Sequence, residues 1–108
     1  MANLNVLEDC DVKTEAEISV VVPLYNEARN LKDFFSELHD AMEAYGKPYE
    51  VIFVNDGSTD DSQEILLDIE DQNNHAQILS LRNNVGKAGA LEQGFKLVSG
   101  NKVVIIDC

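Results

Sequence analysis

The chain has 108 residues, 44% of them hydrophobic, and a formal net charge of −12 at pH 7. This length is typical of one small domain with a modest core. The excess of acids argues against a nucleic-acid-binding protein, because phosphate backbones are neutralised by Lys and Arg.

The first 17 residues are polar, acidic and without periodicity. We expect them to form a poorly ordered leader before a single domain over residues 18–108. They are too polar for a signal peptide, and no apolar stretch has the length of a membrane span. Cys10 and Cys108 lie near opposite ends without metal-ligand spacing, so free thiols are expected, with a bridge between them left open. We therefore expect a cytoplasmic protein.

The charge is uneven along the chain. Residues 1–72 hold 18 acids and 4 bases, whereas residues 73–108 hold 2 acids and 4 bases. The second segment is a candidate to face an anionic ligand. A chance distribution over surface positions is the alternative.

The first predicted strand is the β-branched run 18–22, which ends before Pro23. A helix is predicted next and is stopped by Gly46 and Pro48. Its apolar residues recur at helical spacing, and they are Leu31, Phe34, Phe35, Leu38, Met42 and Tyr45.

The second predicted strand, residues 50–54, leads into the turn 55–57. Ser58 is then predicted to cap a second helix, with Asp61 in the position of a capping-box acid. The buried stripe of that helix is predicted to be Ile65, Leu66 and Ile69.

A third strand is predicted over residues 77–81, and a third helix from Gly86 to a stop at Gly100. The inward residues of this helix are predicted to be Ala88, Leu91, Phe95 and Val98. Residues 102–107 are predicted to form the fourth strand. Alternating strands and helices, with strands apolar enough for burial on both faces, predict an α/β fold: a Rossmann-like parallel sheet of about four strands with helices on both faces.

The strand ends of such a sheet gather at the edge where α/β proteins bind ligands. Asp56 follows the second strand in a turn that leads to a helix N-terminus, which attracts anions. Its carboxylate would repel a phosphate and suits a nucleobase N–H or a ribose hydroxyl better. The alternative is that Asp56 only shapes the turn, with Gly57 for flexibility.

Three further residues at this edge are candidates for a site. Tyr25 and Glu27 offer an aromatic face and a carboxylate after the first strand, or they belong to an ordinary loop. Lys87 is no part of a P-loop, because Ala88 follows it and Leu81 stands where the first glycine belongs, yet it could meet a diphosphate.

Asp107 ends the last strand and could bind Mg²⁺ or Mn²⁺ through its oxygen atoms, although one carboxylate alone makes a weak site. The alternative is that it caps the next turn. His39 and His75 have no paired ligand and receive no role.

Four segments in order resemble the nucleotide-binding half of family 2 glycosyltransferases, which are inverting enzymes with a GT-A fold. They are ISVVVPLYNE at 18–27, YEVIFVNDGSTD at 49–60, RNNVGKAGA at 82–90 and VVIID at 103–107. The basic Gly-Lys segment looks most like the branch that glycosylates polyprenyl phosphates. Asn55 stands where many relatives have Asp.

The resemblance implies a nucleoside-diphosphate sugar, UDP- or GDP-linked, as donor and a polyprenyl phosphate as acceptor. It places Pro23, Tyr25, Glu27 and Val54 around the nucleotide and Asp56 at its base. Lys87 joins this nucleotide site. Asp107 would be the first acid of a metal-binding Asp-x-Asp, for Mg²⁺ or Mn²⁺.

The second acid of that pair, the catalytic base and any membrane-anchoring segment would lie beyond Cys108. The 108-residue chain is therefore expected to bind a nucleoside diphosphate weakly and to transfer no sugar. The parent enzyme would associate with the cytoplasmic face of a membrane.

Two other classes of protein are alternatives. A receiver-like signalling domain would need an acid pair after the first strand and a phosphoacceptor after the third, and neither is present. A non-catalytic α/β interaction module is the other alternative, whose exposed last strand would pair with another chain, including a second copy.

Overall fold

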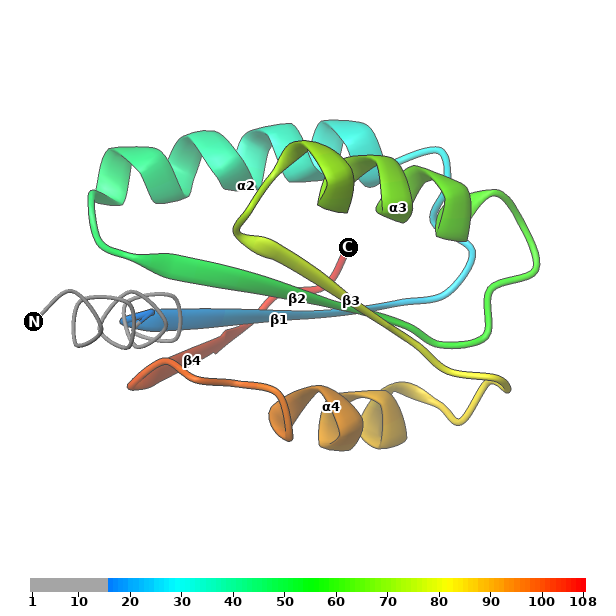
Figure 1. The fold of residues 1–108 in the computed structure, drawn as a ribbon. Coiled ribbons are helices and arrows are strands. Elements are labelled where there is room, and N and C mark those ends of the chain that lie inside the picture. The colour runs from blue at the N-terminus through cyan, green and yellow to red at the C-terminus, as the bar shows by residue number, and fades with distance from the viewer. Residues whose placement is uncertain (1–15) are drawn as a thin grey trace, which may run out of the picture.

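The computed structural model describes residues 16–108 and contains one parallel sheet with the strand order β3-β2-β1-β4. The strands are β1 (Ile18–Leu24), β2 (Tyr49–Asn55), β3 (Ala76–Ser80) and β4 (Lys102–Ile105). The helices are α2 (Leu31–Tyr45), α3 (Ser62–Gln72) and α4 (Lys87–Phe95). Helices α2 and α3 cover one face of the sheet and α4 lies on the other (Figure 1). The predicted α/β fold class is confirmed.

The strand register brings the loops that follow the strands to one edge of the sheet. Leu24 at the end of β1 pairs with Asn55 at the end of β2, which pairs with Ser80 of β3. On the other side of β1, the N–H of Ile106 donates to the Val21 carbonyl at 3.1 Å and continues the pairing past the end of β4. Asp107 therefore lies beside the end of β1.

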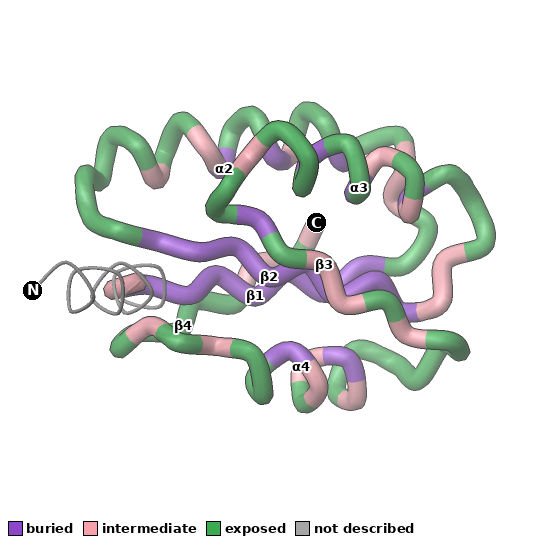
Figure 2. Tube along the Cα trace, in the orientation of Figure 1, coloured by how far each residue is buried: buried purple, intermediate pink, exposed green. Residues whose placement is uncertain are grey.

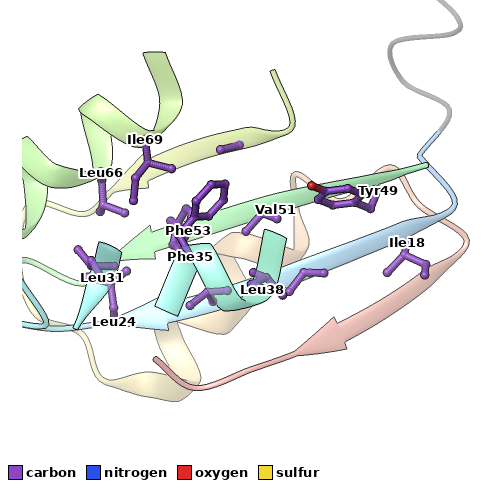
Figure 3. Close-up of a cluster of buried hydrophobic side chains, with 13 residues drawn as sticks. Ile18, Leu24, Leu31, Phe35, Leu38, Tyr49, Val51, Phe53, Leu66 and Ile69 are labelled. Carbon is purple, nitrogen blue, oxygen red and sulfur yellow. The ribbon is translucent and has the colours of Figure 1, made fainter. Parts of the chain in front are cut away.

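The larger part of the core lies between the sheet and helices α2 and α3 (Figure 3). Leu31, Phe35 and Leu38 of α2 are buried there, as are Leu66 and Ile69 of α3, which confirms most of the predicted helix stripes. Tyr45 is exposed instead. Full burial of each such side chain contributes about 1.5–3 kcal/mol, so this face supplies most of the hydrophobic stabilisation.

A smaller cluster lies under α4, where Val21, Ile52 and Val54 meet Ala90. The predicted inward positions of α4 are partly wrong, because Ala88 and Phe95 are exposed while Ala90 and Gly94 are buried. A Cβ on Gly94 would lie 2.8 Å from Cγ2 of Val54, so the helix approaches the sheet through residues with little or no side chain.

Gly100 does not stop α4, which ends five residues earlier at Phe95. Its N–H donates instead to Oγ of Ser19 at 2.8 Å, and the N–H of Ser99 donates to the buried carboxylate of Glu50 at 2.7 Å. These bonds anchor the connection into β4 on the amino ends of the two central strands, β1 and β2. Gly100 was predicted to end the helix, but its N–H and that of Ser99 instead bond to side chains of β1 and β2.

The capping prediction for α3 is also wrong. The helix begins at Ser62, after Asp61, and Oγ of Ser58 accepts the N–H of Asn26 at 2.9 Å. Asp60 supplies the acceptor for the first turn, because its Oδ1 accepts the N–H of Ser62 at 2.9 Å. Residues 58–61 are therefore a connecting loop.

Pro23 lies inside β1, which continues to Leu24. The backbone carbonyl of Val21 points toward β4, where it accepts the N–H of Ile106. Residues two apart on a strand direct their backbone groups to the same neighbouring strand, so the nitrogen of Pro23 also points toward β4. The last paired residues of β1 and β4 are Val21 and Ile105, so Pro23, which has no N–H to donate, lies just beyond the paired part of β4.

Burial differs strongly between the strands (Figure 2). Every residue of β1 and β2 is buried, whereas every residue of β4 is exposed. The expectation of strands buried on both faces therefore fails for β4, which forms one edge of the sheet in the described part of the chain.

The predicted leader lies outside the described residues, except for Ala16 and Glu17. Glu17 belongs with the sheet, because its N–H donates to Pro48 at 2.9 Å and its carbonyl accepts from Lys102 at 3.1 Å. Among residues 16–108, no helix has the length and apolar character needed to cross a membrane.

Candidate functional site

A cavity of about 370 Å³ lies at the carboxyl edge of the sheet, between the loops that follow β1, β2 and β4 and the start of α4. It brings together all the residues predicted for the nucleotide site except Val54. Its lining residues are Pro23, Leu24, Tyr25, Glu27, Asp56, Asn84, Gly86, Lys87, Asp107 and Cys108.

Val54 lies elsewhere. Its side chain is completely buried and packs in the cluster beneath α4, against Ala90 and next to Gly94. Because both faces of β2 are buried, the sequence carries no sign of which of its residues face the cavity. The prediction that Val54 surrounds the nucleotide is corrected: it supports α4 and is absent from the cavity lining.

Asp56 lies at the base of the cavity and is only 4% exposed. Its two oxygens accept backbone N–H groups from the loop before α4, Oδ1 from Val85 at 2.7 Å and Oδ2 from Gly86 at 3.0 Å. A carboxylate has about four acceptor positions, so two remain after these bonds. Asp56 thus fastens the end of β2 to the β3–α4 loop and retains acceptor positions for further donors.

Gly57 allows this approach of the two loops. It has φ of +73°, and a Cβ at this position would lie 2.6 Å from the backbone nitrogen of Asn84. Any other residue would both strain the backbone and push the loop away. The turn therefore does more than reverse the chain, since it holds the loop that carries Gly86 and Lys87.

Tyr25 and Glu27 line the cavity from the loop between β1 and α2. The Tyr25 side chain is 44% exposed. Glu27 begins the turn into α2, since its carbonyl accepts the N–H of Leu31 at 3.1 Å and its Oε1 accepts Nδ2 of Asn30 at 2.8 Å. An exposed aromatic ring and an accessible carboxylate thus lie on one loop.

Lys87 and Asp107 form an ion pair at the mouth of the cavity. Nζ of Lys87 lies 2.7 Å from Oδ1 and 2.9 Å from Oδ2 of Asp107, and their side chains are 59% and 67% exposed. An exposed pair of this kind contributes about 0–1 kcal/mol to stability. Both charges are therefore available to a ligand at little cost to the fold.

Four lining residues lie outside the predicted set, and they are Leu24, Asn84, Gly86 and Cys108. Asn84 accepts the N–H of Gly86 through its Oδ1 at 3.1 Å and shapes the loop before α4. Cys108 is half-buried against the larger core cluster. Burial, and then the negative charge of Glu27, raise the pKa of the Cys108 thiol to about 11, so it stays protonated at neutral pH. Cys108 is a free thiol, as expected, and Cys10 lies outside the described residues.

The two histidines lie away from the cavity. Nδ1 of His39 is 3.1 Å from the hydroxyl of Tyr49, and His75 stacks on the ring of Tyr49 with centroids 4.6 Å apart. Within residues 16–108 no group of three or more His, Cys, Asp or Glu side chains could hold a metal ion. Asp107 offers one carboxylate, whose oxygens are of the donor type that Mg²⁺ and Mn²⁺ prefer.

Comparison with known proteins gives this edge a context. The chain is 40% identical over 91 residues to an uncharacterized glycosyltransferase of Synechocystis. The aligned region covers 84% of this chain and 29% of that relative. Among solved structures it is similar to the mannosyltransferase PcManGT from Pyrobaculum calidifontis in complex with GDP-Man and Mn²⁺, with a TM-score of 0.76 and 24% identity, over 86% of this chain and 27% of the other.

It is also similar to S. aureus TarS 1–349 in complex with UDP, with a TM-score of 0.64 and 25% identity, over 84% of this chain and 27% of the other. These likenesses confirm the predicted Rossmann-like sheet of the GT-A fold. The chain thus spans less than a third of the length of each of these proteins. Residues 19–108 match the model of the glycosyl transferase family 2. The chain belongs to glycosyl transferase family 2.

Proposed function

We propose that the cavity binds the nucleoside diphosphate part of a nucleotide sugar, as the donor site of a sugar-transferring enzyme. The observation that carries the proposal is that an exposed aromatic ring, three carboxylates and a lysine from separate strand ends and the start of α4 converge on one cavity, in a chain of this family. The solved relatives in complex with GDP-Man and with UDP support a nucleotide ligand of either base.

Each side of the cavity suits one part of such a ligand. Tyr25 offers a ring face on which a nucleobase can stack, and Asp56 offers its remaining acceptor positions to a base N–H or a ribose hydroxyl. Lys87, at the N-terminus of α4, is placed for the diphosphate, because both its charge and the helix end attract anions. Glu27 completes the wall between these two parts.

Asp107 is the residue that would hold a divalent cation. Its exposed carboxylate is a hard oxygen ligand, and Mg²⁺ or Mn²⁺ commonly takes one or two carboxylates together with substrate phosphates. The bound cation would neutralise charge on the leaving diphosphate. The PcManGT complex with Mn²⁺ supports this assignment.

The remaining parts of the proposal come from the family resemblance. The whole enzyme would transfer the sugar with inversion to a polyprenyl phosphate, and it would act in the cytoplasm at the membrane face. Residues 1–108 alone would bind the donor weakly without turnover. Sugar transfer by the purified 108-residue chain with Mn²⁺ would contradict this last point.

Calorimetric titration with UDP and with GDP, each with and without Mn²⁺, tests the proposal. We expect weak binding of one nucleotide that strengthens with Mn²⁺, and an Asp107→Asn variant that loses only the Mn²⁺-dependent part. Glu70→Gln, which removes an exposed acid of α3 away from the cavity, is the control. If Asp56→Asn bound UDP and GDP with the same affinities as the wild-type protein, the role of Asp56 would be contradicted. If neither nucleotide bound to the wild-type protein, the proposed site would be refuted.

A second candidate function, an interaction module, is favoured by one observation. Val103, Val104 and Ile105 of β4 are each 41–47% exposed, on a strand with an open outer edge. We propose that a second copy of the chain can pair with this edge. Sedimentation at increasing concentration tests it: a dimer that Val104→Lys abolishes is expected, and a monomer throughout would rule out pairing at this edge.

A further inference from the structure

The loop that carries Tyr25 and Glu27 is held by a row of backbone hydrogen bonds to a second loop. Three successive amides of the β1–α2 loop donate to side chains that precede or begin α3. The N–H of Asn26 donates to Oγ of Ser58 at 2.9 Å, that of Glu27 to Oγ of Ser62 at 3.0 Å, and that of Ala28 to Oδ2 of Asp60 at 3.2 Å. These bonds join residues more than 30 positions apart.

The Asn26 side chain also forms hydrogen bonds to the second loop. Its Oδ1 accepts the N–H of Thr59 at 2.8 Å and that of Asp60 at 3.3 Å, while its Nδ2 donates to Oγ1 of Thr59 at 3.3 Å. Asn26 also has φ of +52°, the one positive φ of a non-glycine residue in the described chain. Asn adopts a positive φ more readily than most residues, so Asn26 suits this backbone conformation and also supplies the side-chain hydrogen bonds to Thr59 and Asp60. We call Asn26, Ser58, Thr59, Asp60 and Ser62 the loop clamp.

None of the loop-clamp residues lines the cavity. Their neighbours do: Tyr25 and Glu27 flank Asn26 on one loop, and Asp56 precedes Ser58 on the other. The clamp therefore fixes the β1–α2 loop relative to the β2–α3 loop, although its own residues do not line the cavity. Ser62 is completely buried, so its bond to Glu27 is protected from water.

From this arrangement we propose that Asn26 is a positioning residue for the donor site, which fixes Tyr25 and Glu27 relative to Asp56 through the loop clamp. The inference rests on the proposed function, because it concerns the affinity of that same site. A loop already held in its binding conformation loses less entropy when a ligand binds. Loss of the clamp should therefore weaken nucleotide binding although no contact to the nucleotide is removed.

The variants separate the clamp from backbone strain. Asn26→Gly keeps an easy positive φ but removes the bonds of the side chain. Ser62→Ala removes the acceptor of the Glu27 N–H and, unlike Asn26→Gly, introduces no glycine. Asn74→Gly is the matched control, an exposed Asn in a turn before β3 at the opposite edge of the sheet.

The first measurement is amide hydrogen exchange, which needs no ligand. In Asn26→Gly we expect exchange at Glu27 and Ala28 to become about tenfold faster, the equivalent of one lost hydrogen bond, while exchange at Val51 in β2 stays unchanged. Ser62→Ala should speed exchange at Glu27, and Asn74→Gly should change neither. Unchanged exchange at Glu27 and Ala28 in Asn26→Gly would overturn the proposal.

The second measurement is calorimetric titration with whichever of UDP or GDP the unchanged protein binds. We expect Asn26→Gly to lose affinity by about threefold to tenfold, with the preference between the two bases retained. Faster exchange with unchanged affinity would overturn the positioning role. If the unchanged protein binds neither nucleotide, the proposed function fails, and the exchange data alone decide whether the clamp holds the loop.

Discussion

The two halves of the cavity are built differently. The half formed after β1 and β2 stands on strands that are buried at every residue, and its loops are joined by the loop clamp. The half formed by α4 and β4 stands on an exposed edge strand and ends in an exposed ion pair. A rigid wall suits recognition of a nucleobase and ribose, while charged groups with few packing partners can adjust to a diphosphate and a cation.

The largest expected effect contrasts the cores of the two halves. Phe53 is completely buried between the sheet and α2, so Phe53→Ala should lower the free energy of unfolding by about 3–5 kcal/mol. Val104→Ala in β4 should cost less than about 1 kcal/mol, because the side chain is already partly in water. Urea unfolding followed by circular dichroism measures both.

If Phe53→Ala does not fold, Phe53→Leu should fold with a loss under about 1.5 kcal/mol. Similar losses for Phe53→Ala and Val104→Ala would contradict the comparison and indicate that β4 is covered in solution.

The next effect compares two glycines that both have positive φ. Gly57→Ala should cost more than Gly46→Ala, since a Cβ at 57 would meet the backbone of Asn83 and Asn84 whereas that at 46 meets nothing within 4 Å. The positive φ alone costs about 1–2 kcal/mol in each variant. Thermal unfolding of the two variants tests whether Gly57→Ala loses more stability than Gly46→Ala, because the close contact between the β2–α3 and β3–α4 loops leaves no room for a Cβ. Equal losses would mean that the loops can move apart freely.

A smaller effect concerns the pH dependence of the rigid wall. Hydrogen bonds from Ser62, and then from the N–H of Ala28, hold the pKa of Asp60 below its usual value. A carboxyl with a lowered pKa in the folded state stabilises the fold above its unfolded pKa, and this contribution is lost as the pH falls through the folded value. The stability difference between the unchanged protein and Asp60→Asn should therefore shrink as the pH falls from about 6 to about 3.

Urea unfolding at several pH values measures this difference, with Asp71→Asn as the control for removing one acid from an exposed surface of α3. A difference for Asp60→Asn that grows toward low pH would show that the carboxylate does not stabilise the loop clamp.

The smallest effect on stability belongs to the adjustable wall. Lys87→Met should change the free energy of unfolding by less than about 1 kcal/mol, because the ion pair with Asp107 is exposed. The same variant should weaken nucleotide binding and reduce its dependence on salt, whereas Lys96→Met at the other end of α4 should not. Calorimetry at low and high salt measures this. A large loss of stability in Lys87→Met would mean that this wall is rigid too.

Much of this architecture could be predicted from local sequence. The β-branched runs predicted β1 and β2, and the helical spacing of Leu31, Phe35 and Leu38 predicted the buried face of α2. The polar residues at the strand ends predicted the cavity, because parallel strands with helical crossovers bring their carboxyl ends to one edge. Strand and helix periodicity depends on neighbours in the chain, so these features needed no tertiary information.

Other features depended on contacts between distant residues. Asn26 bonds to Thr59, which is 33 positions away, and Asp56 accepts from Val85 and Gly86 across another loop. The sequence also could not show to which face of the sheet the Val54 side chain points. Both faces of β2 are buried, so its residues do not alternate between apolar and polar. Helix ends at Ser62 and Phe95 followed from where backbone amides found partners in space.

The sequence by itself therefore determined the order of strands and helices, the edge of the sheet that carries the polar groups, and the family. Only the tertiary structure decided which polar groups bond to one another and which remain free for a ligand. The physical reason is that a hydrogen bond depends on the distance and direction between two groups in space. In the loops after β1, β2 and β3 those groups come from segments far apart in the chain.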